Sequence, residues 1–530
     1  MNAYGTGWAA AATVAGPLLA AFLQGAAGKG KVGQRVRSVV FALGLLAGAA
    51  AAGWVAWAVL WGGVPHWTYV FGAGAGESFL PSGAGGAPIR IQFHVDAAGA
   101  MMLLVAALTS LAAGAVALRS EAGTSGRAGF QSLYLLLVAG VYGMCATGDA
   151  FNFFVFLEIT SLAGAALTAY RLDGGLAAEA GLKYAAISSL GGLSFLMGVG
   201  LLLGQHNLLN LSALADHFRL HGLTRLDETA FLLMAVPLAM KCGAAPMHHW
   251  TPDTYSRAPV PVSAFLLVSS QASLYGLYRV SFTLFGGGGM WRGAGLGLTA
   301  MAVASMFIGV TMAIIQHDVK RLIAHHAVSQ TGYMLLGAGV CLAALGRPGE
   351  MADYGRDALA GGLFHMVNYA IYNGLLFLGA GAVIWRTGRR NLDEMGGLAR
   401  RMPWTAACFG VGALAIAGIP PMSGFASKWV LYESVFRMSP LLSVVAMAVS
   451  LLTLASFVKV FQAMFLGPER KAFEGVREVP RLWVASMAAL ALLTVLVGLF
   501  PDVAMDRVVR PAADALLDAA GYVGTMARGG

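Results

Sequence analysis

Long apolar runs recur along the whole chain, and they constrain its fold more than any other feature. A run of about 18 or more apolar residues is long enough to cross the hydrocarbon core of a bilayer as a helix. Backbone polar groups in lipid must be satisfied within the same segment, so such runs are expected to be helical. We therefore predict an all-α, polytopic integral membrane protein. About fourteen runs are present, centred near residues 17, 49, 107, 138, 159, 192, 236, 272, 306, 335, 371, 415, 453 and 491.

Composition supports this class and excludes others. Apolar residues make up 58% and charged residues 11% of the chain, against about 45–50% and about 25% in soluble domains. The excess of Lys and Arg, 34 against 25 Asp and Glu, forms no basic stripe of the kind that binds nucleic acid, so no nucleic-acid partner is expected. The four cysteines show no C-x-x-C pair. The sequence therefore predicts neither a disulfide nor a metal site, and it predicts no bound cofactor.

Basic residues gather in alternate loops and indicate an orientation. They follow the first, third, ninth, eleventh and thirteenth runs, which are all odd-to-even connections. Examples are Lys29, Arg127, Lys320, Arg390 and Arg477. By the positive-inside rule these loops face the cytoplasm, which puts both termini and the loop at residues 62–94 outside. The membrane is expected to be a prokaryotic plasma membrane.

One apolar run carries a lysine within it and a proline just beyond it. Lys241 lies well inside the run that begins near Thr229, where a cation costs about 2.5–3.5 kcal/mol even on lenient insertion scales. Pro246 lacks a backbone donor, so the helix is expected to break between Gly243 and Pro246, as helices do where they line protein or water. This pattern indicates an ion path. The alternative is that Lys241 snorkels to a membrane surface or balances a structural carboxylate.

The run near residue 415 repeats this arrangement. Pro420 and Pro421 follow Gly418, and Lys428 lies just beyond them. Two broken helices five runs apart predict two five-helix units, and an odd number of helices per unit inverts the second unit relative to the first. The expected domains are 1–129 (three N-terminal helices), 130–285 (first five-helix unit), 286–467 (second five-helix unit) and 468–530 (last helix and tail).

Further ionisable residues lie within other runs. Glu158 is expected to be either a proton carrier or one half of a static ion pair. We expect it to interact with Lys241, directly or through one water, because each would otherwise be an isolated charge at membrane depth. Lys183 is close enough to a helix end to snorkel. His325 and His326 either titrate near neutral pH or are hydrogen-bonded at a helix start.

His365, Tyr369 and Asn373 follow one another at four-residue intervals within a single run. This spacing places them on one helix face. Such a polar stripe either supports a chain of water molecules or forms hydrogen bonds that hold neighbouring helices together.

Five phrases, in order, resemble one family of membrane proteins. They look like the antiporter-like subunits shared by respiratory complex I, Mrp-type cation/proton antiporters and membrane-bound hydrogenases, and most like an Mrp D-type subunit. The resemblance implies fourteen helices, two inverted five-helix units, broken helices seven and twelve, and a mid-membrane row of residues that carries protons. The phrases, which run from about residue 96 to about residue 467, are TGDAFNFFVFLE, EAGLKY, AMKCGAAPMHHWTPDTYSRAPVPVSAFL, QHDVKRLIAHHAVSQTGYMLLGAG and GGLARRMPWTAACFGVGALAIAGIPPMSGFASKW.

The resemblance assigns five residues of the predicted proton path. The two adjacent histidines are added because an apolar run follows them and imidazole can titrate near neutral pH. The predicted path is Glu158, Lys183, Lys241, His325, His326, His365 and Lys428. The chain departs from the family where members commonly carry lysine in helix eight, near Gln271, and where many carry histidine and lysine in helix eleven, at Tyr369 and Asn373. These three residues can hold a water chain, because amides and phenols donate and accept, but they cannot store a proton at neutral pH.

Two functions are consistent with these residues. The first is a subunit of an Mrp-type, complex I-type or hydrogenase-type complex that translocates a proton, alone or in exchange for Na⁺ or K⁺. The second is a degenerate, non-conducting scaffold. Retained charges at membrane depth favour the first function, because they are costly without a use, and the missing lysines favour the second. The expected partners are other membrane subunits, the transported ions and lipid, and no catalytic centre is expected in this chain.

Overall fold

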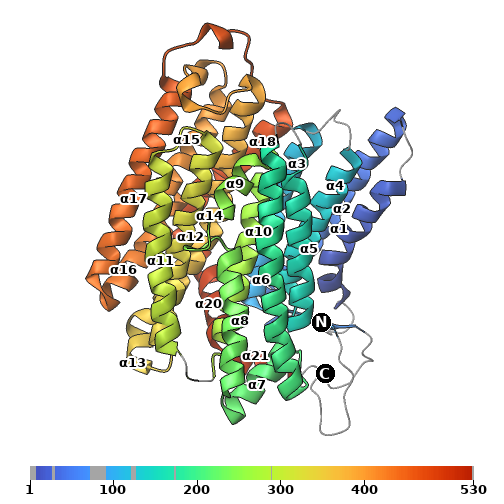
Figure 1. The fold of residues 1–530 in the computed structure, drawn as a ribbon, viewed down its shortest axis with the longest axis vertical. Helices are drawn as coiled ribbons and strands as arrows, with labels where there is room; N and C mark the ends of the chain where they lie inside the picture. Colours follow the sequence, from blue (N-terminus) through green and yellow to red (C-terminus); the bar gives the residue numbers. More distant parts are fainter. Residues whose placement is uncertain are drawn as a thin grey trace.

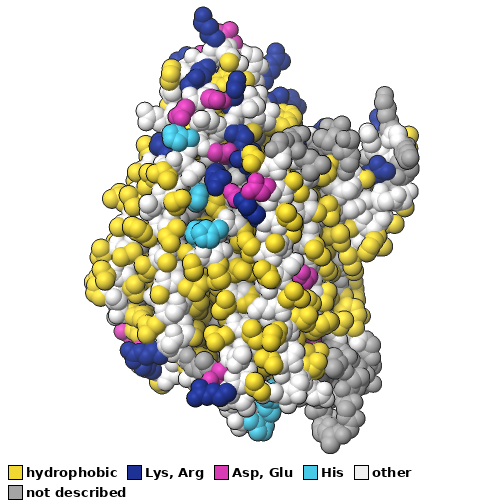
Figure 2. Space-filling model, in the orientation of Figure 1, with side chains coloured by type: hydrophobic (Ala, Val, Ile, Leu, Met, Phe, Trp, Pro, Cys, Tyr) yellow, Lys and Arg dark blue, Asp and Glu magenta, His cyan; other side chains and the backbone are white. Residues whose placement is uncertain are grey.

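The long helices of the protein run side by side along one common direction (Figure 1). The computed structural model describes residues 7–26, 30–71, 91–120, 127–171, 175–287, 289 and 291–527. Charged side chains gather toward the two ends of the molecule, and apolar side chains form a band between them (Figure 2). This is the distribution expected of a protein that crosses a bilayer, because apolar side chains face the hydrocarbon and charges face water.

Twelve helices in the described part of the chain are long and apolar enough to cross a membrane. They are α1 (Trp8–Ala26), α2 (Gly30–Leu60), α3 (Ala97–Ser120), α4 (Arg127–Ala146), α5 (Ala150–Thr168), α6 (Leu176–His206), α10 (Val260–Tyr278) with its π-helical extension η2 (Arg279–Leu284), α11 (Trp291–Ile314), α12 (Val319–Ala344), α14 (Arg356–Thr387), α17 (Pro440–Phe461) and α18 (Arg481–Leu499). Each predicted centre lies inside an observed helix, the remaining two being in α8 (Arg225–Lys241) and α15 (Pro403–Ala417). The total of fourteen spans stays a prediction.

Two helices are interrupted where the sequence predicted. α8 stops at Lys241 before α9 (Trp250–Arg257), and α15 stops at Ala417 before α16 (Ser423–Met438). Each connecting turn contains a glycine with positive φ, Gly243 at 82° and Gly418 at 76°, and a proline three residues later. Glycine adopts this backbone conformation without steric cost, and proline removes a helical donor. The predicted interruptions at 243–246 and 418–421 are therefore confirmed.

The order of helices places each interruption at the same position in a group of five. The first group is α4, α5, α6, α8–α9 and α10, and the second is α11, α12, α14, α15–α16 and α17. This order agrees with the two predicted units at 130–285 and 286–467. The domain boundaries and the inversion of the second unit stay predictions.

A small hairpin departs from the expected all-helical structure. β1 (Trp67–Val70) pairs antiparallel with β2 (Gln92–Val95). Both segments are rich in aromatic and β-branched residues, which favour strands in an extramembrane loop. Most of the loop predicted to face outward, at residues 72–90, lies outside the described residues, as does Lys29.

The two ends of the bundle differ in what they carry. α7 (Leu211–His221) and α21 (Ala519–Ala527) lie at the end of the bundle shown at the bottom of Figure 1. α19 (Pro501–Ala504) and α20 (Arg510–Leu517) connect α18 to α21. The basic loops that follow α14 and α17 lie at the opposite end (Figure 1). α12 is buried along its whole length and α10 over almost all of it, so these two helices form the centre of the bundle.

Candidate ion path

Lys241 and Glu158 meet at the first interruption. Lys241 is the last residue of α8, and its side chain is 5% exposed. Its Nζ lies 3.4 Å from Oε1 of Glu158 on α5 and also donates to Oγ of Ser161, one turn further along α5. The predicted proximity of Glu158 and Lys241 is confirmed, and a carboxylate and a hydroxyl together satisfy this buried ammonium.

Lys428 lies beside the second interruption, but in α16, the helix that follows the break, whereas Lys241 ends the helix that precedes its break. Nζ of Lys428 donates to the carbonyl of Ile416 at 2.7 Å and to Oγ of Ser450 on α17 at 2.9 Å. The ring of Tyr333 on α12 lies 4.8 Å from the same Nζ. Within the described residues, no carboxylate is close enough to form an ion pair with Lys428. Its charge is therefore stabilised by the negative end of the α15 dipole and by an aromatic face.

His365 of α14 is fully buried between α12 and α16. Its Nδ1 lies 3.0 Å from Oγ of Ser427, the residue before Lys428. Its Nε2 lies 3.1 Å from Oε1 of Gln330 on α12 and 3.3 Å from the hydroxyl of Tyr372. A hydrogen-bonded group therefore extends from α12 through the imidazole to the helix that carries the second lysine.

A serine hydroxyl contacts each of these three bases, and each hydroxyl also has a backbone partner. The hydroxyls of Ser161, Ser427 and Ser450 donate to the carbonyl oxygens of Leu157, Gly424 and Ala417, at 2.6, 3.2 and 3.0 Å. A hydroxyl can accept from a charged base while it donates to the carbonyl, or it can turn and donate to the neutral base. Both protonation states of each base can therefore be hydrogen-bonded without movement of the backbone.

α12 connects the residues around Lys241 with those around His365 and Lys428. Thr331 donates through Oγ1 to the carbonyl of Cys242 at 3.3 Å, beside Lys241, while the preceding Gln330 contacts His365.

Of the predicted polar relay, Gln271 on α10 donates to the carbonyl of Met366 on α14 at 2.6 Å. Tyr369 and Asn373 are buried on α14, and the ring of Tyr369 contacts that of Tyr372. The relay role of these three residues stays a prediction.

Lys183 lies away from the Lys241 group. Its side chain is 48% exposed, and its Nζ contacts Glu179 at 2.6 Å and Asp253 of α9 at 3.1 Å. Arg321, at the start of α12, contacts the same Asp253 at 3.1 Å. The structure therefore places Lys183 in a surface ion cluster that ties α6, α9 and α12 together.

The two adjacent histidines of α12 have different surroundings. His326 is fully buried, and its Nε2 lies 2.8 Å from Oγ of Ser456 on α17. His325 is also buried, but neither of its ring nitrogens has a hydrogen-bond partner among the described residues. Within the described residues, neither histidine is hydrogen-bonded to His365 or to a lysine of the path.

Sequence reasoning missed the residues that surround the bases. Gln330, Tyr372 and the three serines carry no charge, and each residue type is common in membrane helices as ordinary packing or hydrogen-bonding glue. The only available signal was adjacency, since Ser427 precedes Lys428 and Ser161 lies one helical turn from Glu158.

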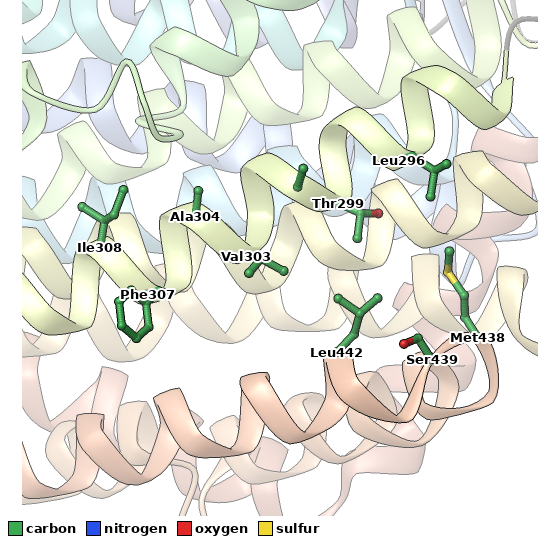
Figure 3. A pocket seen from close by; sticks show the side chains of 10 residues that line it. Leu296, Thr299, Val303, Ala304, Phe307, Ile308, Met438, Ser439 and Leu442 are labelled. Carbon is green, nitrogen blue, oxygen red and sulfur yellow. The ribbon is translucent and has the colours of Figure 1, made fainter.

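An apolar groove lies apart from these residues. It has a volume of about 760 Å³ and lies on α11, facing the start of α17 (Figure 3). Its apolar lining includes Leu296, Phe307 and Ile308 of α11 and Leu442 of α17. No ionisable side chain is among its described lining residues, so the groove is not part of the ion path.

Comparison with known proteins gives consistent matches over most of the chain. The family model described as "NADH:quinone oxidoreductase/Mrp antiporter, TM" matches residues 147–453, a range that includes both interruptions. NADH-quinone oxidoreductase subunit N of Desulforudis audaxviator is 33% identical over 80% of this chain and 85% of its own. The D-type Na(+)/H(+) antiporter subunit of Alkalihalophilus pseudofirmus is 30% identical over 84% and 88%. A chain of the Mrp complex from Dietzia sp. has a TM-score of 0.83 at 26% identity, over 99% of this chain and 100% of that chain.

Proposed function

Because this chain belongs to the NADH:quinone oxidoreductase/Mrp antiporter family of membrane subunits, we propose that it translocates protons as part of a multisubunit membrane complex. The observation that carries this proposal is the contact of the buried Lys241 with Glu158 at a helix interruption. Lys428 is a second buried lysine, beside the second interruption.

The cost of these charges favours transport over a scaffold. Cations at membrane depth are expensive, and a buried ion pair can often be replaced by apolar residues without loss of stability. A subunit that only positioned its neighbours would gain little from burying Lys241 and Lys428. A subunit that moves protons needs such groups, because they can change charge within the membrane.

The geometry around Lys241 supports a reversible proton transfer. When the amine is protonated, Glu158 and Ser161 accept from it; when it is neutral, the Ser161 hydroxyl can turn from Leu157 and donate to it. The 3.4 Å contact with Glu158 is longer than the usual charge-assisted hydrogen bond of about 2.7–2.9 Å. The pairing is therefore weak enough to be loosened as charges move nearby.

Exposure of Glu158 supports a role inside a larger assembly. Its side chain is 23% exposed although it lies within a membrane-crossing helix. A carboxylate facing lipid is costly, so a neighbouring subunit is expected to cover it. Similarity to the D-type Na(+)/H(+) antiporter subunit and to a chain of the Mrp complex favours an Mrp-type assembly that exchanges protons for Na⁺ or K⁺. In this proposal the basic loops face the cytoplasm of a prokaryotic cell and both termini lie outside.

Substitution of Lys241 tests the proposal. Lys241→Arg keeps the positive charge but removes the neutral state, because a guanidinium stays protonated. We expect cation-dependent proton movement, measured in vesicles that carry the whole complex, to be almost abolished while a native gel shows normal assembly. Lys459→Arg is the matched control, because its Nζ binds only the carbonyls of Ile314 and Gln316 within the described residues. Parental transport in assembled Lys241→Arg complexes would instead support the scaffold.

A further inference from the structure

The two ring nitrogens of His365 have partners of different chemistry. Oε1 of Gln330 can only accept a hydrogen bond, so Nε2 of His365, at 3.1 Å, must carry a proton. Oγ of Ser427, 3.0 Å from Nδ1, can either donate or accept. The neutral imidazole is therefore held as the Nε2–H tautomer, with the lone pair of Nδ1 facing the helix that carries Lys428.

The side chain of Gln330 is held in this orientation from one side only. The hydroxyl of Tyr372 donates to the same Oε1 at 3.2 Å, so both lone pairs of this oxygen are used. The amide Nε2 of Gln330 is buried and has no hydrogen-bond partner among the described residues. The amide can therefore turn at the loss of two accepted hydrogen bonds, and a turned amide would donate its N–H to the imidazole.

Ser427 allows a proton to be gained and lost at Nδ1. With neutral His365 the hydroxyl donates to Nδ1, and with charged His365 it accepts from Nδ1–H and donates to the carbonyl of Gly424, 3.2 Å away. The proton on Nε2 stays hydrogen-bonded to Oε1 of Gln330 in both states. While the amide oxygen faces the ring, His365 can exchange protons only on the side of Ser427.

We propose that Gln330 is a positioning residue that gates proton passage through His365. With the amide oxygen toward the ring, His365 binds its second proton at Nδ1, the nitrogen that faces Ser427 and the helix of Lys428. With the amide turned, the Nδ1–H tautomer is favoured and Nε2 can accept. In a concerted relay the new N–H bond at Nε2 takes its proton from the Tyr372 hydroxyl, 3.3 Å away, which is reprotonated by water. At the same time the Nδ1–H bond breaks, and its proton passes to Oγ of Ser427, which releases its own hydroxyl proton to water. One proton enters and one leaves, so atoms and charge balance. The gate rests on the proposed function, since it needs protons to move through this chain.

Among the described residues, three titratable groups lie around His365. They are Tyr333 of α12, whose ring centroid lies 5.4 Å from that of the imidazole, Tyr372 on the same helix, and Lys428 on α16, whose Nζ lies over the Tyr333 ring. The lysine is the only one of these groups that is charged at neutral pH in its usual form. A pH profile of His365 therefore reports on Lys428 and on the partner at position 330.

Two substitutions of Gln330 test the gate in the assembled complex. Gln330→Met keeps the size but removes both polar atoms, and Gln330→Glu keeps the shape but adds a charge that favours the doubly protonated ring. Nitrogen spectra of ring-labelled histidine, assigned by loss of one signal in His365→Phe, should show Nε2–H in the parent. We expect mixed tautomers in Gln330→Met and a charged ring up to a higher pH in Gln330→Glu. Proton movement should fall about tenfold in both variants, as for the loss of one hydrogen bond to a charged group.

Gln131→Met on α4 is the matched control, because it removes another buried amide without a described contact to the path. It should leave the His365 spectrum and transport unchanged. Parental transport together with an unchanged His365 tautomer in both Gln330 variants would overturn the gate alone. A parental complex that moves no protons would overturn the proposed function and the gate together, and the spectra would still show whether Gln330 orients the ring.

Discussion

Gly192 of α6 lies against the carboxylate of Glu158, with no space between them for a side chain. A Cβ atom at residue 192 would overlap Oε1 of Glu158, which is the oxygen that contacts Lys241. The absence of a side chain on one helix therefore sets the position of a charge on another.

The first prediction concerns this contact. Gly192→Ala should push the flexible carboxylate away from Lys241 and lower proton transport by roughly tenfold, about the effect of weakening one charge-assisted hydrogen bond. Assembly should be normal, because the Glu158 side chain is partly exposed and has room to move. The control is Gly200→Ala on the same helix, where an added Cβ would meet open space among the described residues. Equal transport in the two variants would show that the position of Glu158 is not critical.

The second prediction concerns the hydroxyl beside Lys241. Ser161→Ala removes the group that binds the amine in both protonation states, so we expect transport to fall by about tenfold while the complex still assembles. Ser194→Ala removes a comparable hydroxyl, which donates to the carbonyl of Leu233 between α6 and α8. It should leave transport near the parental rate in the same vesicle assay. A similar loss in both variants would point to helix packing as the cause.

The third prediction separates backbone strain from function at the second interruption. Gly418 has a φ of 76°, and an added Cβ would lie 3.0 Å from Cδ of Lys428. Gly175 also has a φ of 76°, but its Cβ position is open among the described residues. Alanine at either position should cost about 1–2 kcal/mol of stability, measured by thermal unfolding of the purified chain. Only Gly418→Ala should also reduce transport, because it alone displaces the lysine; equal transport would refute that link.

The fourth prediction concerns pH and stability. Burial raises the pKa of Asp149 to about 6, although backbone hydrogen bonds from Asn152 and Phe151 oppose this rise. The folded chain therefore binds a proton that the unfolded chain has lost at intermediate pH, so this group stabilises the fold below about pH 4 and loses that contribution as pH rises to about 6. Asp149→Asn keeps the cap on Asn152, since asparagine also caps helices well. It should raise the melting temperature at pH 7. Between pH 4.5 and 7 the melting temperature of the variant should fall less than that of the parent.

Asp318 provides the control for this measurement. It caps α12 in the same way, but its carboxylate also pairs with Arg390 at 2.9 Å. Asp318→Asn should therefore lower the melting temperature at pH 7, opposite in sign to Asp149→Asn. A lower melting temperature in both variants would mean that ionised Asp149 stabilises the fold.

Helix positions and both interruptions were predictable from sequence because they depend on local properties. Apolar run length sets where a helix can cross the bilayer, and glycine with proline sets where it breaks. Lys241 and Glu158 were predictable as a pair because two isolated charges at membrane depth are costly.

The surroundings of the bases could not be predicted in this way. Gln330, Ser427 and Ser450 come from three different helices, and their meeting depends on packing that no local pattern encodes. Serine also bonds to its own helix backbone, so its sequence position does not reveal whether its second contact is a base. Lys183 shows the converse, because its place near a helix end allowed either a path or a surface role, and the fold gave it Glu179 and Asp253 as neighbours.

The complete enclosure of α12 has a consequence for how the protein is made. Gln330 binds His365 of α14, His326 binds Ser456 of α17, and Tyr333 donates to the carbonyl of Ala446 on α17. All of these partners are synthesised after α12. We therefore expect that, when α12 enters the bilayer, these three side chains have not yet met their native partners, and that they are paired only after α14 and α17 have been inserted.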